Sequence, residues 1–332
     1  MNNILLILTG GTIGSKDNSG IIGTANSGCR ILELAAPYLK DHRFDVRQPM
    51  NILSENLEPK HWEKLIGFIL SEELSSYDGI LITHGSDTLS YTSAMLGLTL
   101  CGLGLPVVIT AADKVPDAPG SNALFNFCAA ARLISQRKSG VYTVYKNSGD
   151  SKASVFVPTR LNEADRVNDR FTSFDGEPAA YIDENGNITD VSSRLFSETE
   201  TAENIIGNRP IKFDREVLMI HPYPSIDYRA VIRSITDTTG AVLHIAYHSA
   251  TVSENAAVLA DECKRRNIPL YLCSFKKGNN SIYESSAHIL EKGALPLFDI
   301  STEAAFAKLL LGINLFPDKL HTMFNVQCTM YN

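Results

Sequence analysis

The chain has 332 residues, of which 44% are hydrophobic, and its mean hydropathy is close to zero. That length and composition suit two ordinary globular domains. Lys and Arg number 30 against 37 Asp and Glu, so the formal net charge is −7. This mildly acidic balance argues against nucleic acid or an anionic membrane as the main partner, because both attract basic patches.

The chain begins with an apolar stretch at residues 1–10. It is shorter than the roughly 20 residues of a membrane span, and it has neither the basic start nor the cleavage site of a signal peptide. We therefore expect a buried strand there and no membrane association. The six cysteines include no CxxC pair, which predicts free thiols in a reducing cytoplasm.

Short apolar runs alternate with helical patterns through the first half of the chain. Strands are predicted at residues 4–8, 79–83, 106–110 and 140–145, and helices at 31–40, 62–74, 88–100 and 122–135. Continuous apolar strands separated by helices predict an α/β fold with a mostly parallel sheet that has helices on both faces.

A polar stretch at residues 183–214 interrupts this alternation, which then resumes. We place a larger N-terminal domain at residues 1–190, a linker at 191–214 and a smaller C-terminal domain at 215–332. The second domain has predicted strands at 217–221, 242–247 and 270–273, and predicted helices at 254–266 and from 303. It is therefore expected to be a parallel-sheet α/β domain as well.

The first predicted strand runs into a glycine-rich turn, "LTGGTIGS". Three interpretations are open: a plain turn, a phosphate-binding loop, or a turn that presents Thr12 as a nucleophile. The turn matches the dinucleotide-binding pattern only in part, because Thr9 stands where the first glycine belongs. Thr12 is expected to point into the crevice beyond the carboxyl end of the strand, where open α/β sheets bind ligands.

A second turn of the same kind follows the strand at 79–83, in "ITHGSDTLSYTSAML". It adds the Ser86 hydroxyl and the Asp87 carboxylate at a neighbouring strand end. A carboxylate repels phosphate but attracts an amine-bearing substrate. The alternative is structural, since Ser86 or Asp87 can cap the helix that starts near Thr88. His84, in the same turn, is expected to be a hydrogen-bonded turn residue.

Taken together, the two turns resemble the signature segments of the bacterial L-asparaginase/glutaminase family, TGGTI[GA] and HGTDT. "ILSEN" resembles the substrate-carboxylate loop of that family, "LPVVITAADKVP" its third strand, and "LPLFDISTEAAFAKLLLGIN" a C-terminal segment of its cytoplasmic type I branch. The resemblance assigns substrate binding to Gly11, Ser54, Glu55, Gly85 and Ala112.

The resemblance implies hydrolysis of the side-chain amide of asparagine. Thr12 attacks the amide carbon and releases ammonia, and water then frees the acid. Ser86 is the second hydroxyl, and Asp87 serves the proton relay and holds the substrate ammonium. A threonine hydroxyl needs such a base to become nucleophilic. Backbone N–H groups near Gly11 and Ser86 are expected to bind the oxyanion.

Three positions depart from the family pattern. Ile21 stands where the family has a helper tyrosine, and Ser86 replaces a threonine. The relay lysine is missing from "VPTRLNEADRVNDRF", where Asn162 takes its place by spacing. Arg160 is the expected substitute cation, although an arginine does not readily release a proton. Asn122 also replaces an aspartate of the family, which we interpret as an altered turn.

The sequence therefore predicts a cytoplasmic amidohydrolase with a small-molecule amide substrate and no cofactor. By resemblance it forms a homodimer or homotetramer with sites between subunits. His244 and His248 share a strand face but lack a third ligand, so no metal is expected. Two alternatives stay open: a ligand-binding protein that has lost the proton relay, and a nucleotide-binding protein built on the glycine-rich turn.

Overall fold

The computed structural model describes residues 1–18, 21–24, 28–137, 139–174, 176–201, 206–207, 209–275 and 281–320, without the side chains of 15–29, 194 and 201. The chain divides into two compact units, one comprising Met1–Ile211 and the other beginning at Lys212. This division lies inside the stretch expected as a linker.

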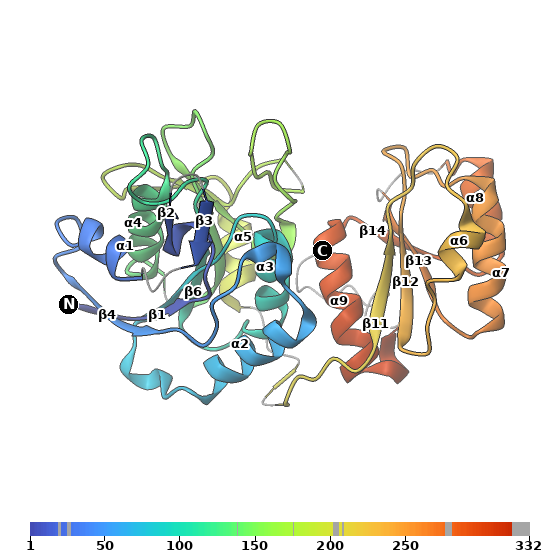
Figure 1. The fold of residues 1–332 in the computed structure, drawn as a ribbon, viewed down its shortest axis with the longest axis horizontal. Helices are drawn as coiled ribbons and strands as arrows, with labels where there is room; N and C mark the ends of the chain where they lie inside the picture. Colours follow the sequence, from blue (N-terminus) through green and yellow to red (C-terminus); the bar gives the residue numbers. More distant parts are fainter. Residues whose placement is uncertain are drawn as a thin grey trace. The chain divides into compact units, whose positions relative to one another are not determined.

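Across the described residues, the centre of the first unit is an eight-stranded sheet (Figure 1). In spatial order its strands are β10 (Ile188–Asp190), β9 (Ala180–Ile182), β8 (Ala153–Phe156), β7 (Gly140–Tyr145), β6 (Pro106–Thr110), β5 (Gly79–Thr83), β1 (Asn2–Leu8) and β4 (His42–Arg47). The five strands from β7 to β4 run parallel, while β8, β9 and β10 pair antiparallel. The carboxyl ends of β1, β5, β6 and β7 therefore share one edge.

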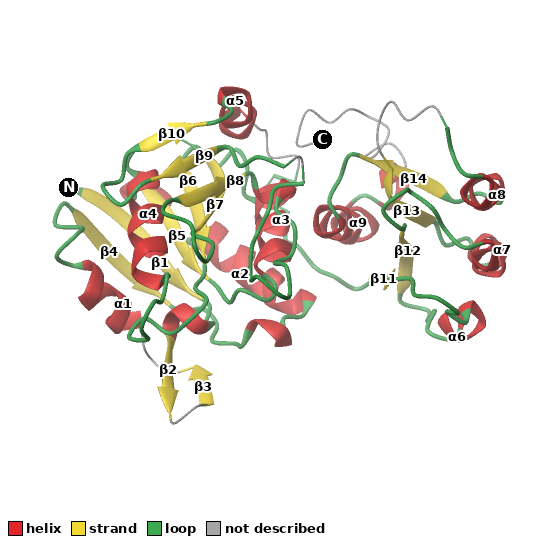
Figure 2. Cartoon of the chain, turned by 90° about the horizontal axis from the view of Figure 1, so that it is seen from above, coloured by secondary structure: helices red, strands yellow, loops and turns green. Residues whose placement is uncertain are grey.

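Helices cover both faces of this sheet (Figure 2). On one face lie α1 (Gly28–Ala35) and α4 (Ala123–Ile134), and on the other α2 (Pro59–Ser71) and α3 (Leu89–Thr99). The side chains of β1, β5, β6 and β7 are buried along nearly their whole length, as expected for parallel strands covered on both sides. The predicted mostly parallel α/β sheet is confirmed.

Two elements of the first unit differ from expectation. Strand β4 was not predicted, because at this edge "HRFDVR" is only partly buried and shows no continuous apolar run. Helix α5 (Ser193–Thr201) lies within the expected linker. Its Leu195 and Phe196 are buried in the core of the first unit, so this part of the polar stretch is packed structure.

After Thr12 the backbone forms a hairpin of β2 (Ser15–Asn18) and β3 (Ile21–Thr24), and the Ile21 side chain lies outside the described residues.

The second unit contains a parallel sheet in the order β11 (Glu216–Ile220), β12 (Thr239–Ile245), β13 (Leu270–Phe275) and β14 (Leu295–Phe298). Three helices cover one face, α6 (Tyr228–Ile232), α7 (Ala257–Arg265) and α8 (Glu284–Glu291), and α9 (Thr302–Leu315) covers the other (Figure 2). The predicted smaller parallel-sheet unit is confirmed.

His244 is a fully buried imidazole in the second unit. It stacks on Tyr228 with ring centroids 5.6 Å apart, and its Nε2 is 2.8 Å from the Tyr228 hydroxyl. Burial, the main cause, lowers the pKa of His244 from 6.5 to about 4. The residue therefore stays neutral in the folded state at pH values where the unfolded chain already binds a proton.

We expect the free energy of unfolding to be highest above pH 6.5 and to fall as the pH drops from 6.5 towards 4. A pKa difference of this size corresponds to about 3 kcal/mol for one histidine at the acidic end. The measurement is urea unfolding at about pH 7.5 and pH 5, with wild type and His244→Gln compared. The glutamine variant should lose less stability on acidification, because it has no group that titrates there. Equal losses in both proteins would contradict the assignment.

Candidate active site

A cavity of about 500 Å³ opens at the carboxyl edge of the first sheet. Four hydroxyl residues line it: Thr12, Ser54, Ser86 and Tyr145. Six carboxylates line it as well: Glu55, Asp87, Asp113, Glu163, Asp165 and Asp169. Arg166 is the one cationic residue among the described residues of the lining. A concave, strongly acidic site of this kind favours a ligand that carries an ammonium group.

Glycine residues allow backbone contact between the Thr12 turn and the Ser86 turn. Gly11 has a φ of +76°, and a Cβ added to it would lie 2.5 Å from the Cα of Gly85. Gly10 has a φ of +104°, and its added Cβ would lie 2.7 Å from the backbone nitrogen of Ile52. Both positions require glycine, because a side chain would be strained and would overlap a neighbouring backbone. The contact between Gly11 and Gly85 sets Thr12 and Ser86 side by side in the chain's two signature turns.

Hydrogen bonds hold the turns in this arrangement. The Thr9 hydroxyl donates to the Thr83 carbonyl at 2.8 Å, and the Thr88 hydroxyl donates to the Ser54 carbonyl at 3.0 Å. The Gly11 N–H donates to the Ile52 carbonyl at 3.1 Å. Three loops from distant parts of the sequence are thus tied together. Because the Gly11 N–H is engaged with Ile52, it is not a ready donor for an oxyanion.

The Ser86 and Asp87 side chains do not cap the following helix. Helix α3 begins at Leu89 with Thr88 as its N-cap residue, and no side-chain hydrogen bond caps it. Thr88 directs its hydroxyl to Ser54 instead. Ser86 and Asp87 line the cavity, so both remain available for chemistry there.

His84 is a structural residue of the same turn. It is 1% exposed, its Nδ1 lies 2.8 Å from the Gly85 carbonyl, and its Nε2 lies 3.1 Å from the Thr92 hydroxyl. Burial lowers the pKa of His84 to about 4, so the ring is neutral near pH 7. The expectation of a hydrogen-bonded turn residue is confirmed, and His84 does not line the cavity.

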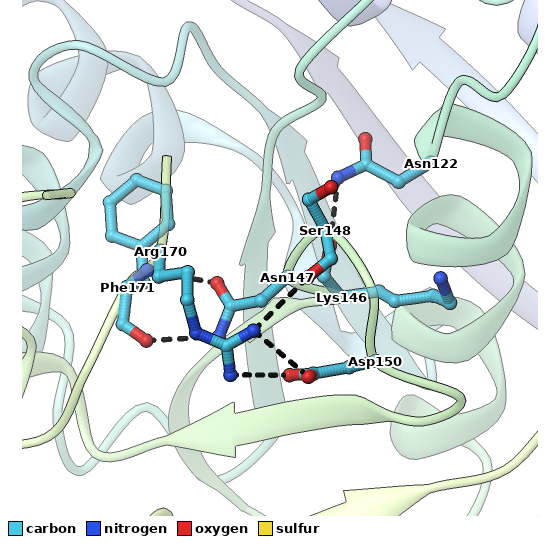
Figure 3. A network of polar contacts seen from close by, with 7 residues as sticks. All are labelled: Asn122, Lys146, Asn147, Ser148, Asp150, Arg170 and Phe171. Carbon is cyan, nitrogen blue, oxygen red and sulfur yellow. Dashed lines mark hydrogen bonds and ion pairs between the residues drawn. The ribbon is translucent and has the colours of Figure 1, made fainter. Parts of the chain in front are cut away.

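One wall of the cavity comes from a loop that carries Glu163 to Phe171. Asn147 holds this loop through both backbone polar groups of Phe171. Its side-chain oxygen accepts from the Phe171 N–H at 2.8 Å, and its side-chain nitrogen donates to the Phe171 carbonyl at 3.0 Å. Arg170 pairs with Asp150 and donates to the Ser148 carbonyl, both at 3.0 Å (Figure 3). The loop is therefore fastened to the turn that follows β7.

The position that departs from the family aspartate, Asn122, also serves the framework. Its backbone N–H and side-chain oxygen exchange hydrogen bonds with Asp113 at 3.1 and 3.0 Å. Its amide nitrogen donates to the Lys146 carbonyl at 2.8 Å (Figure 3). Asn122 thus connects the loop after β6 to the end of β7, which is more than an altered turn.

The substrate-binding residues expected from the sequence separate into two groups. Gly11, Ser54 and Glu55 line the cavity. Gly85 and Ala112 do not; Gly85 packs behind it, and an added Cβ there would lie 2.5 Å from the Ser54 Cβ. Ala112 is fully buried in the hydrophobic core, and the next residue, Asp113, lines the cavity in its place.

The expected relay cation, Arg160, is also placed differently. It belongs to the 3-10 turn Pro158–Arg160, which packs on α3, and it is 8% exposed. The cavity is lined instead by Arg166, and no lysine lines it within the described part of the chain. Arg160 is therefore buried outside the described lining of the cavity.

Sequence reasoning missed Asp113, Tyr145 and the wall residues Glu163, Asp165, Arg166 and Asp169. The first two had a readable signal, because Asp113 closely follows one predicted strand and Tyr145 ends another. The wall residues had none, since they reach the cavity through a loop that is anchored by long-range contacts.

No cluster of three or more metal-ligating side chains occurs among the described residues. Among the helices in this described part of the chain, none is long and apolar enough to cross a membrane.

Fold and cavity together define an α/β protein with an acidic, hydroxyl-lined site at the carboxyl edge of its first sheet. A family model described as asparaginase, N-terminal, matches residues 3–193. The match covers more than half of the chain, and the chain therefore belongs to the asparaginase family. The resemblance recognised in the sequence is confirmed.

Curated relatives include the glutamyl-tRNA(Gln) amidotransferase subunits D of two archaea. The Methanosphaera stadtmanae protein is 27% identical over 320 residues, which cover 93% of this chain and 71% of the relative. The Pyrococcus abyssi protein is 27% identical over 329 residues, with coverage of 92% and 71%.

Solved structures show the same fold. The thermostable L-asparaginase from Thermococcus kodakarensis aligns with a TM-score of 0.75 at 24% identity, covering 99% of this chain and 96% of the other. A probable cytoplasmic L-asparaginase from Campylobacter jejuni aligns with a TM-score of 0.76 at 20% identity, covering 98% and 99%. At these identities the likeness establishes architecture only.

Proposed function

We propose that this protein hydrolyses the side-chain amide of L-asparagine, or of a related small amide, to the acid and ammonia. The observation that carries the proposal is the meeting of the Thr12 and Ser86 turns, with Asp87, at one cavity. Hydroxyl and carboxylate groups together on a cavity wall are what a threonine nucleophile needs for activation.

In the proposed reaction the Thr12 oxygen attacks the amide carbon while its proton passes through Ser86 to the Asp87 carboxylate. The tetrahedral intermediate collapses with protonation of the nitrogen, so ammonia leaves and an ester to Thr12 remains. Water then adds to this ester, which releases the acid and restores the Thr12 hydroxyl. We assign oxyanion binding to the backbone N–H groups of Thr12 and Ser86, because that of Gly11 is bonded to Ile52. One such donor typically contributes about 10²- to 10³-fold in rate.

The charge of the cavity supports an amine-bearing substrate. Asp87 and Glu55 lie on its wall with four further carboxylates, and a carboxylate stabilises an ammonium group nearby. Free asparagine is the first choice because it joins an ammonium and a side-chain amide. Glutamine is the second choice, since two relatives are amidotransferase D subunits.

A second candidate, a ligand-binding protein without turnover, is favoured by one observation. Arg166 is the one cationic residue in the described lining of the cavity, which contains no lysine, and an arginine stays protonated and cannot relay a proton. Such a protein would bind the ligand in the same cavity.

Ammonia release by the purified protein separates the two candidates. Asparagine, glutamine and short asparagine-containing peptides are supplied, and thermal unfolding is recorded with and without L-aspartate. We expect ammonia from at least one amide and an increase in Tm with aspartate, because a ligand that binds only the folded state stabilises it. A higher Tm without ammonia from any of them would establish the binding protein instead.

A further inference from the structure

We propose that Tyr145 is a substrate-binding residue of this cavity, whose phenol donates a hydrogen bond to an acceptor oxygen of the ligand. The inference rests on the proposed function, because it takes the cavity to hold a small amide and its acid product. It adds a contact that neither signature turn contains, since Tyr145 comes from a different strand.

The first support for this role of Tyr145 is its position in the first unit. It is the last residue of β7 and stands at the sheet edge where the Thr12 and Ser86 turns lie. Its side chain lines the cavity although the residue is only 2% exposed. Tyr145 is therefore enclosed in the wall and borders the cavity.

The ring is held in place, as a specific contact requires. Phe171 packs edge-on against it, with centroids 4.7 Å apart at 66°. Phe171 is fastened in turn by two hydrogen bonds to Asn147 (Figure 3). On the other side, the Lys146 N–H donates to Asn126 at 2.8 Å, and the Asn122 side chain holds the Lys146 carbonyl. The backbone that follows Tyr145 is thus fixed from two sides.

The Tyr145 hydroxyl keeps its proton and is hydrogen-bonded to the Asn122 side chain. Burial raises the pKa of Tyr145 to about 12, and a hydrogen bond from the Asn122 side chain offsets this only in part. The phenol is therefore neutral near pH 7 and keeps its proton to donate. A ligand oxygen at this point of the cavity would accept that proton.

The surrounding charge selects what Tyr145 recognises. Asp113 and Asp169 both act on it through their charge, and carboxylates at pH 7 only accept hydrogen bonds. A carboxylate or carbonyl oxygen of the ligand is repelled by these acids and needs neutral donors. The phenol meets that need, so the contact favours ligands that keep an acceptor oxygen beyond the reacting amide.

The test is Tyr145→Phe, which removes one oxygen and keeps the ring against Phe171. Affinity for L-aspartate is measured by calorimetry in a Thr12→Ala background, where turnover cannot interfere. We expect about tenfold weaker binding, the typical effect of losing a hydrogen bond to a charged group. In the active protein KM should rise by a similar factor with kcat within about twofold.

Tyr142→Phe is the matched control. Tyr142 lies on the same strand and is fully buried, but its hydroxyl donates to the Ser139 carbonyl at 3.0 Å and it does not line the cavity. We expect unchanged aspartate affinity in this variant. Equal affinity in Tyr145→Phe and its parent, or no binding by the parent, would overturn the inference. Aspartate binding that depends on Tyr145 in a protein without ammonia release would uphold it while the proposed function fails.

Discussion

Replacing Thr12 with alanine should lower ammonia release by about 10⁴-fold or more, the scale seen when a covalent nucleophile is removed. The reason is that Thr12 lines the cavity beside the Ser86 turn and supplies the oxygen that forms the acyl intermediate. Stability should change little, because Thr12 is only partly buried in its 3-10 turn. The measurement is the initial rate of ammonia release at saturating amide, with Tm recorded in parallel.

Thr12→Ser is the control for this prediction, because it keeps a hydroxyl at the same position. It should retain measurable activity, reduced by the extra rotamer freedom that comes with losing the methyl group. Equal rates in wild type and Thr12→Ala would rule out the proposed mechanism. In that case Ser86, the other hydroxyl residue of the two turns, would become the candidate nucleophile.

Replacing Gly11 with alanine should lower the free energy of unfolding by about 3 kcal/mol, the combined scale of backbone strain and overpacking. Its φ of +76° disfavours any side chain, and the new Cβ would overlap the Gly85 backbone. Relief of this overlap must separate the Thr12 and Ser86 turns. Activity should therefore fall far more than the loss of folded protein explains, as seen by comparing urea unfolding with the rate per folded molecule.

Gly14→Ala is the matched control, three residues further along the chain. Nothing lies within 4 Å of a Cβ added at Gly14, and its φ is not in the left-handed region. This variant should keep both stability and activity within a small margin of wild type. If Gly11→Ala were as mild as Gly14→Ala, the two turns would not depend on close backbone contact.

Local pattern was a reliable guide where side chains are buried on both faces. The runs "ILLIL", "GILIT" and "PVVIT" are apolar without interruption, and all three form central strands. The edge strand β4 escaped detection because "HRFDVR" mixes polar and apolar residues. Helix α5 was taken for linker because its sequence, SRLFSETET, is polar apart from Leu195 and Phe196, which are buried in the core.

The residues of the candidate site also differ in whether nearby sequence or long-range contacts determine their positions. Thr12, Ser86 and Asp87 stand in glycine turns at strand ends, so local sequence was enough to single them out, whereas Ser54 and Glu55 were assigned by the resemblance to the family. Arg160 was expected as the substitute relay cation, yet it is buried in its turn and Arg166 lines the cavity instead. Spacing along a loop does not determine which side chains face inward, because long-range contacts such as those of Asn147 decide the loop's path.

The sequence by itself determined the α/β class, the family and the two turns that bear hydroxyl groups, because each depends on residues close together in the chain. Only the tertiary structure decided that Gly11 meets Gly85 and that a carboxylate-rich loop closes one wall. These features arise from contacts between segments far apart in sequence. Their geometry follows from backbone approach and packing, which no local pattern encodes.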